Sequence, residues 1–96
     1  MATKTVKFNQ SAVEKLPNNK PVIYRIGSST NPDLYIGVAK RGRVQDRIKE
    51  HLPAGKDPIP GGSKVQIKQM LSIHDAEKKE KELIGRHKPT HNKQGK

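Results

Sequence analysis

The chain has 96 residues and a formal net charge of +11, with 20 Lys and Arg against 9 Asp and Glu and only 30% hydrophobic residues. This length predicts one domain, residues 1–96, and excludes a second. The absence of Cys excludes disulfides, thiolate zinc sites and cysteine nucleophiles. With no run of 18 apolar residues and no secretory signal, we expect a soluble cytoplasmic protein. The positive charge indicates a polyanionic partner, most commonly nucleic acid.

The first half of the chain predicts a short helix and a hairpin. Ser11 and Glu14 have the spacing of a capping box and predict a short helix. The β-branched and aromatic residues of 21–26 and 34–38 predict two strands. The turn-forming residues 27–33 between them predict a hairpin with a long loop.

The second half predicts a helix, a loop, a strand and a second helix. Apolar residues at helical spacing predict the first helix over 44–52. Three prolines and three glycines within 53–63 predict the loop. Alternating apolar residues predict a half-buried strand over 65–73, although residues 68–71 are also compatible with a helix. The last helix is predicted over 75–87, where a following proline ends it.

Glu80 lies on the apolar side of the last predicted helix. It stands four residues after Ala76 and three before Leu83, and therefore shares their face, whereas Glu77 and Glu82 do not. A carboxylate on such a face costs free energy unless a metal ion or a phosphate-facing cleft satisfies it. The alternative is that Glu80 lies at the edge of the apolar stripe and pairs with a lysine in solvent.

Two pairs of polar side chains have both a functional and a structural explanation. Arg47 and His51 are four residues apart in the first long helix, and together they can hold a phosphate. The alternative is an ordinary solvated helix face. Tyr24 and Tyr35, two of only three aromatic residues, lie on the two strands of the hairpin. They either pack across the strands or place two hydroxyls where they can position or deprotonate a water.

These residues, taken in order, resemble the motif set of the GIY-YIG nuclease superfamily, and the chain is similar to the N-terminal nuclease domain of the excinuclease C subunit. The set consists of Val22-Ile23-Tyr24, Tyr35-Ile36-Gly37, Arg47 with His51, Glu80 and Asn92. The match runs from about residue 21 to 92, and we expect residues 1–9 and 93–96 to be flexible. The alignment places the family's metal-binding glutamate on Glu80, the residue that the helical face also singles out.

The resemblance implies a mixed α+β fold, in which a small sheet of three antiparallel strands is flanked by helices. It also implies a DNA endonuclease that hydrolyses phosphodiester bonds with a single divalent ion, Mg²⁺ or Mn²⁺. On this chain Glu80 would ligate the ion. Tyr24 would accept a proton from the attacking water, directly or as a tyrosinate, and Tyr35 would orient the water or the phosphate. Arg47 would stabilise the charge on the phosphorane, and His51 would assist as a proton relay.

The resemblance also implies supporting residues. Gly37 and Asn92 would support the site, the latter by hydrogen bonding. Four basic residues that follow the second predicted strand are expected to contact nucleic acid: Lys40, Arg41, Arg43 and Lys49. Arg43 is a competing candidate for the catalytic arginine, because the segment between Tyr35 and Arg47 is two residues longer than in several relatives.

The expected partner is DNA, double-stranded or branched, and a homodimer or a partner protein would supply double-strand cleavage and specificity. The alternative is a non-catalytic basic nucleic-acid-binding or accessory protein of the same fold. Five polar motif positions favour the enzyme, since a pure binder needs only lysines and arginines. Membrane binding is not expected, because the chain has no Trp and its single Phe lies outside any amphipathic helix.

Overall fold

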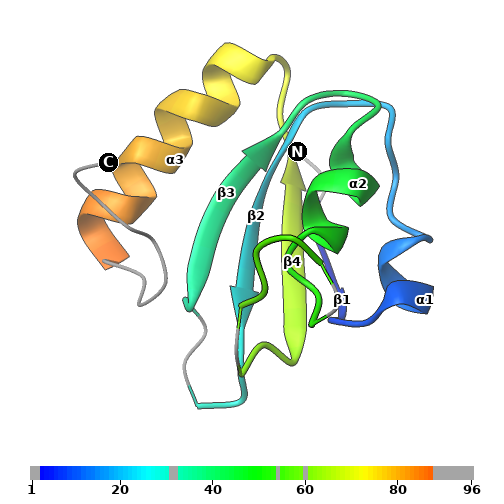
Figure 1. The fold of residues 1–96 in the computed structure, drawn as a ribbon. Helices are drawn as coiled ribbons and strands as arrows, with labels where there is room; N and C mark the ends of the chain where they lie inside the picture. Colours follow the sequence, from blue (N-terminus) through cyan, green and yellow to red (C-terminus); the bar gives the residue numbers. More distant parts are fainter. Residues whose placement is uncertain (1–2, 31–32, 54, 60, 88–96) are drawn as a thin grey trace.

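A computed structural model describes residues 3–30, 33–53, 55–59 and 61–87. These residues form a small mixed α+β domain, which confirms the expected fold class. In chain order its elements are β1 (Thr3–Lys7), α1 (Gln10–Val13), β2 (Val22–Gly27), β3 (Tyr35–Ala39), α2 (Val44–Lys49), β4 (Lys64–Gln69) and α3 (Ile73–His87) (Figure 1). None of the helices within the described ranges has the length and apolarity needed to cross a membrane.

The sheet has four antiparallel strands in the order β1-β4-β2-β3, so the expectation of three strands is wrong. The fourth strand, β1, comes from the first nine residues, which were expected to be flexible. It pairs along β4 with Val6 opposite Val65, and Val6 packs against the core. Burial of this one valine and pairing with the free edge of β4 together stabilise the strand.

Several predicted element boundaries differ from the structure, and the two strands of the hairpin are each shifted by one residue. The strand predicted over 65–73 ends at Gln69, and Leu71 has 74% of its surface exposed. α3 therefore begins at Ile73, two residues earlier than predicted. α2 ends at Lys49, not at residue 52, because the following loop folds back on the helix end. The short helix α1 is capped by Asn9, whose Oδ1 accepts from the Ala12 N–H at 2.8 Å, and not by Ser11.

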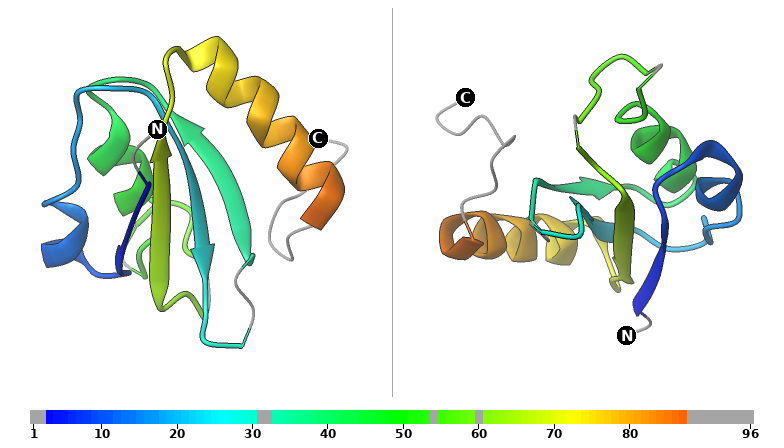
Figure 2. Two further views of the ribbon diagram at one scale, coloured as in Figure 1. Left: turned by 180° about the vertical axis from the view of Figure 1, so that it is seen from behind. Right: turned by 90° about the horizontal axis from the view of Figure 1, so that it is seen from below.

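The alternation of side chains along β2 supplies two separate cores. Tyr24 and Ile26 face the larger core, which α1 and α2 cover, whereas Ile23 faces α3. The helices consequently lie on opposite faces of the sheet (Figure 2). β3 is an edge strand, and α3 lies beside it (Figure 1). One cavity at this edge is lined by Val38 of β3, Arg47 of α2 and Glu77 of α3, so side chains from the two faces of the sheet meet here.

Candidate active site

The ring of Tyr24 lies across β3 because Gly37 has no side chain. Tyr24 and Gly37 are directly paired between β2 and β3. A Cβ on Gly37 would lie 2.6 Å from the Tyr24 hydroxyl oxygen and 2.9 Å from Cε2 of Tyr35, well inside van der Waals contact. The two tyrosine rings stack with their centroids 6.1 Å apart. Gly37 is thus what allows both phenols to occupy the same end of the sheet.

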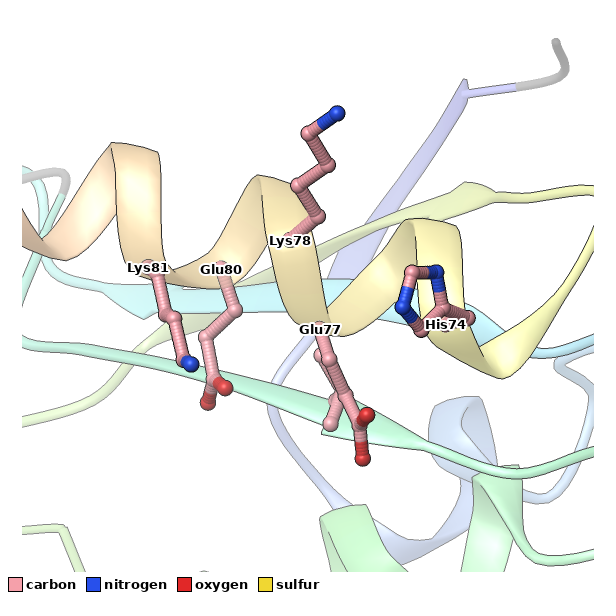
Figure 3. Close-up of a pocket in the computed structure, with 6 residues that line it drawn as sticks. His74, Glu77, Lys78, Glu80 and Lys81 are labelled. Atoms are coloured by element: carbon pink, nitrogen blue, oxygen red, sulfur yellow. The ribbon is translucent and has the colours of Figure 1, made fainter.

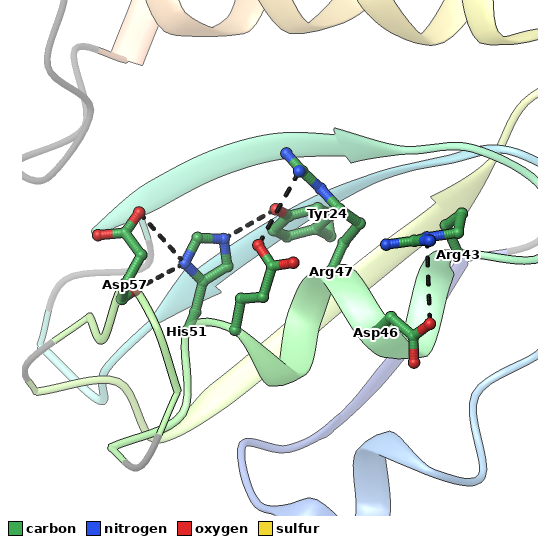
Figure 4. Close-up of polar contacts among 7 residues, drawn as sticks. Tyr24, Arg43, Asp46, Arg47, His51 and Asp57 are labelled. Atoms are coloured by element: carbon green, nitrogen blue, oxygen red, sulfur yellow. Dashed lines mark hydrogen bonds and ion pairs between the residues drawn. The ribbon is translucent and has the colours of Figure 1, made fainter.

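His51 joins this pair of phenols from beyond the end of α2. Its Nε2 lies 2.9 Å from the Tyr24 hydroxyl (Figure 4). Its ring centroid is 4.4 Å from that of Tyr35. Its Nδ1 lies 2.9 Å from the backbone carbonyl of Asp57. A carbonyl can only accept, so Nδ1 carries a proton, and in the neutral ring Nε2 accepts the hydroxyl proton of Tyr24.

The loop after α2 holds His51 in place. Ile59 is buried, and its N–H donates to the His51 carbonyl at 3.0 Å. The Asp57 N–H donates to the Glu50 carbonyl at 2.8 Å, which brings the Asp57 carbonyl to the imidazole. Sequence reasoning missed the part that Asp57 plays, because the acceptor is a backbone atom and carries no side-chain signal.

Arg47 approaches the phenols from α2, whose first N–H, on Val44, donates to Asn18 Oδ1 at 2.7 Å. The Arg47 side chain is 46% exposed, and its guanidinium lies 3.9 Å from the Glu50 carboxylate. Figure 4 shows that it points toward β3, whereas Arg43 lies one turn earlier beside Asp46, at 4.0 Å. Arg47 and His51 do not share a helix face, because α2 has ended before His51, but both reach the site.

Glu80 approaches the same edge of β3 from the opposite face of the sheet. It is half-buried and lines a cavity of about 610 Å³ with Val38, His74, Glu77, Lys78 and Lys81 (Figure 3). Burial and the charge of Glu77 raise its pKa, and the charges of Arg47 and Lys81 oppose that rise. Among the described residues Glu80 forms no ion pair, whereas the exposed Glu82 pairs with Lys79 at 3.0 Å.

The electrostatics link these side chains across the sheet edge. Burial raises the pKa of Tyr24 above its usual range, and the charges of Tyr35 and Glu80 raise it further. The positive charge of Arg47 lowers it. The pKa of Tyr35 is raised by burial and by the charges of Asp57 and Glu80, and is lowered by Arg47. Both phenols are therefore neutral at physiological pH, and Arg47 and Glu80 act on each of them.

Glu80 fits a magnesium site of the kind that the family resemblance implies. Its carboxylate supplies the hard oxygen donor that Mg²⁺ requires, and Mg²⁺ commonly binds through one or two carboxylates while keeping several waters. In the parts of the chain that the structure describes, no group of three or more His, Asp or Glu side chains is arranged to hold an ion. A site at Glu80 would thus be a one-carboxylate site, with the Glu77 carboxylate beside it.

The four basic residues expected to contact nucleic acid lie in three different surroundings. Lys40 and Arg43 line a cavity of about 500 Å³ together with Arg47. Arg41 is exposed in the turn before α2. Lys49 is directed away from the site, since its ammonium lies 3.0 Å from the Glu14 carboxylate beside α1.

Asn92, the remaining predicted site residue, lies outside the described residues. Comparisons of the chain with protein-family models, with curated proteins and with solved structures found no match.

Proposed function

We propose that this protein is a divalent-metal-dependent DNA endonuclease that hydrolyses phosphodiester bonds at the edge of β3. One juxtaposition carries the proposal. Tyr24 on β2, Arg47 on α2 and Glu80 on α3 come from separate segments of the chain, yet the charges of Arg47 and Glu80 both act on the Tyr24 phenol. Metal-dependent phosphodiester hydrolysis needs a group that accepts the proton of the attacking water, a cation that stabilises the charge on the phosphate, and a carboxylate that binds the metal.

The proton path of the proposed reaction runs through Tyr24 to His51. His51 Nε2 is already 2.9 Å from the Tyr24 hydroxyl and in the tautomer that accepts its proton. Tyr24 accepts a proton from the attacking water while its own proton passes to His51, so that no free tyrosinate is required. This relay replaces the tyrosinate considered from the sequence, which the raised pKa of Tyr24 disfavours.

The partly exposed side chains determine how substrate would approach. Tyr24 has no exposed surface, whereas Tyr35 is half-buried and Arg47 is 46% exposed. Water and phosphate would therefore have to pass these two residues to reach the phenol, and a local opening of the site is needed to bring water to its hydroxyl. In this position Tyr35 orients the water, and the Arg47 guanidinium contacts phosphate oxygens as negative charge builds on them.

Glu80 would hold the ion, which when bound would neutralise phosphate charge and lower the pKa of a bound water. The half-buried position of Glu80 costs free energy when the carboxylate is ionised. A bound cation would offset this cost, whereas the carboxylate alone does not stabilise the fold.

A non-catalytic DNA-binding domain is the second candidate. The observation that favours it is the complete burial of Tyr24, which keeps the proposed proton acceptor from contacting water in the conformation described. Such a protein would bind DNA with the same cations but would cleave none.

A cleavage assay separates the two candidates. Purified protein is incubated with plasmid, branched, damaged and single-stranded DNA, with Mg²⁺, with Mn²⁺ or with EDTA. If the protein is a nuclease, we expect metal-dependent cleavage of at least one of these substrates. DNA binding without cleavage of any of them, in either metal, would support the second candidate and contradict the first.

A further inference from the structure

None of the described helices packs on half of one face of the sheet. α3 packs on β3 and β2, and Figure 2 shows it displaced from β4 and β1. The face that α3 leaves open carries alternate residues of these two strands, opposite in direction to the buried Val65 and Ile67. They are polar or basic, and we call them, with the neighbouring Arg25, the basic face: Thr5, Lys7, Arg25, Lys64, Gln66 and Lys68.

The lysines of the basic face form no ion pair with any residue that the structure describes. Lys7 and Lys64 are direct partners in the β1–β4 register. Like charges placed directly opposite each other destabilise a sheet. Within the described part of the chain, no carboxylate lies within 4 Å of the ammonium of Lys7, Lys64 or Lys68. The repulsion between these lysines therefore destabilises the folded protein, and a bound anion would reduce this repulsion.

The basic face is shaped as a groove beside α3. One hollow of about 240 Å³ lies between α3 and β4, and its lining includes Lys68, Lys79 and Leu83. A second, of about 250 Å³, is lined by Thr5, Arg25, Gly27, Lys64 and Gln66. Arg25 and Gln66 line both, so the two hollows adjoin.

The lysines of the basic face extend over the length of several phosphates. Lys64 and Lys68 are four residues apart on one strand, which separates them by about 13 Å. Over that length duplex DNA carries several phosphate charges. The basic face contains no aromatic residue in its described part, because Phe8, Tyr24 and Tyr35 all pack in the core on the other side. Aromatic stacking platforms are the usual feature of single-strand binding sites, so their absence here favours a duplex.

We propose that the basic face binds the phosphate backbone of duplex DNA, as a second contact surface separated from the candidate active site by α3. Lys7, Lys64 and Lys68 contact phosphates, and Gln66 and Thr5 supply neutral hydrogen-bonding groups between them. The choice of DNA as the partner rests on the proposed function. The binding itself requires neither the metal nor Glu80.

The test is DNA binding in EDTA, measured by fluorescence anisotropy with a labelled blunt duplex over a series of salt concentrations. The test variant is Lys7→Gln/Lys64→Gln/Lys68→Gln. A matched control removes the same charge from exposed lysines off the basic face: Lys4→Gln/Lys15→Gln/Lys20→Gln. Circular dichroism checks that both variants are folded.

The test variant is expected to lose about tenfold or more in affinity relative to the control, with a salt slope smaller by about 2–3, since each phosphate contact contributes about 0.9. The single variant Lys64→Gln is expected to reduce the slope by about 0.9. Equal losses in the test variant and the control would show that only net charge matters and would overturn the proposal. Displacement of the duplex by poly-glutamate as effectively as by unlabelled duplex would overturn DNA as the occupant.

The two proposals fail separately in this experiment. If Glu80→Gln abolishes cleavage while the test variant binds and cleaves as the control does, the basic face is not a DNA site and the proposed function stands. If wild-type protein cleaves nothing but the test variant loses duplex binding, the enzyme is excluded and the basic face stands.

Discussion

The Tyr24 hydroxyl lies 2.9 Å from His51 Nε2, in a contact that connects the centre of the sheet to the end of α2. Both residues are buried, and the Asp57 carbonyl fixes the other imidazole nitrogen as a donor. In the neutral imidazole this hydrogen bond therefore runs from the phenol to Nε2. It supports both the fold and the proposed proton path, and these two roles can be measured independently.

Tyr24→Phe is expected to remove the proton path and reduce cleavage by about 10²–10⁴-fold. It also leaves His51 Nε2 buried without a donor, which costs about 1–3 kcal/mol of stability. Single-turnover cleavage and urea unfolding measure the two effects. A matched Tyr35→Phe variant should lose less stability, because Tyr35 is only half-buried. Wild-type cleavage by Tyr24→Phe would exclude Tyr24 from the reaction.

Gly37→Ala is expected to destabilise the protein by about 1–3 kcal/mol, because the new methyl group would overlap the Tyr24 ring and displace it. Gly85→Ala provides the control, since Gly85 is exposed in α3 and its Cβ would meet no atom within 4 Å. That substitution should stabilise the helix by about 0.5–1 kcal/mol. Thermal unfolding of the two variants gives the comparison, and equal stabilities would contradict the close approach of Tyr24 to Gly37.

Much of the candidate site could be predicted from the sequence, because it depends on local periodicity. Strand patterns place Tyr24 and Tyr35 on the two neighbouring strands of a hairpin, and the helical stripe of α3 places Glu80 beside Leu83. These patterns are set by neighbouring residues, so they can be recognised without knowing the fold.

The remaining features depend on contacts between distant segments. β1 contains a single apolar residue in its interior, Val6, and forms because the edge of β4 is free to pair with it. The Asp57 carbonyl reaches His51 only because the loop folds back on the end of α2. Backbone acceptors and strand partners have no signature in the residues themselves, and for this reason neither could be predicted.

Asp57→Asn tests the side-chain carboxylate of this residue separately from its backbone carbonyl. The carbonyl holds the imidazole at 2.9 Å, whereas the carboxylate lies 3.8 Å from Nδ1 and is exposed. The variant keeps the carbonyl and is expected to cleave within about threefold of wild type, since an exposed charge pair contributes little. Gly55→Ala should be impaired, because its Cβ would overlap the backbone of Glu50 and displace the loop. A large loss in Asp57→Asn alone would assign the role to the carboxylate.

Glu80→Gln is expected to be at least as stable as wild type at pH 7. Burial raises the pKa of Glu80 in the folded protein above its ordinary value of 4.5. The folded state therefore gains stability from protonated Glu80 below about pH 4.5, and this gain is lost as the pH rises through the folded pKa. At pH 7 the ionised carboxylate opposes folding, and the neutral glutamine removes that cost. Thermal unfolding at pH 7 and pH 4 should show the difference shrinking at the lower pH.

Mg²⁺ or Mn²⁺ is expected to raise the unfolding temperature of wild type at pH 7, since a ligand that binds only the folded state stabilises it. The increase should be absent in Glu80→Gln and should decrease as the pH falls, because protonation of Glu80 competes with the ion. An equal increase in both proteins would place the ion elsewhere.

The rate of plasmid nicking in Mg²⁺, compared between Glu80→Gln and Glu82→Gln, is the most direct measurement of whether this protein is a nuclease. Both variants remove one carboxylate from α3, but Glu80 lines the cavity at the edge of β3 and Glu82 is exposed beside Lys79. We predict that Glu82→Gln nicks at the wild-type rate and that Glu80→Gln is slower by about 10²-fold or more. Equal nicking by the two variants, or no nicking by wild type, would contradict a metal-dependent active site at Glu80.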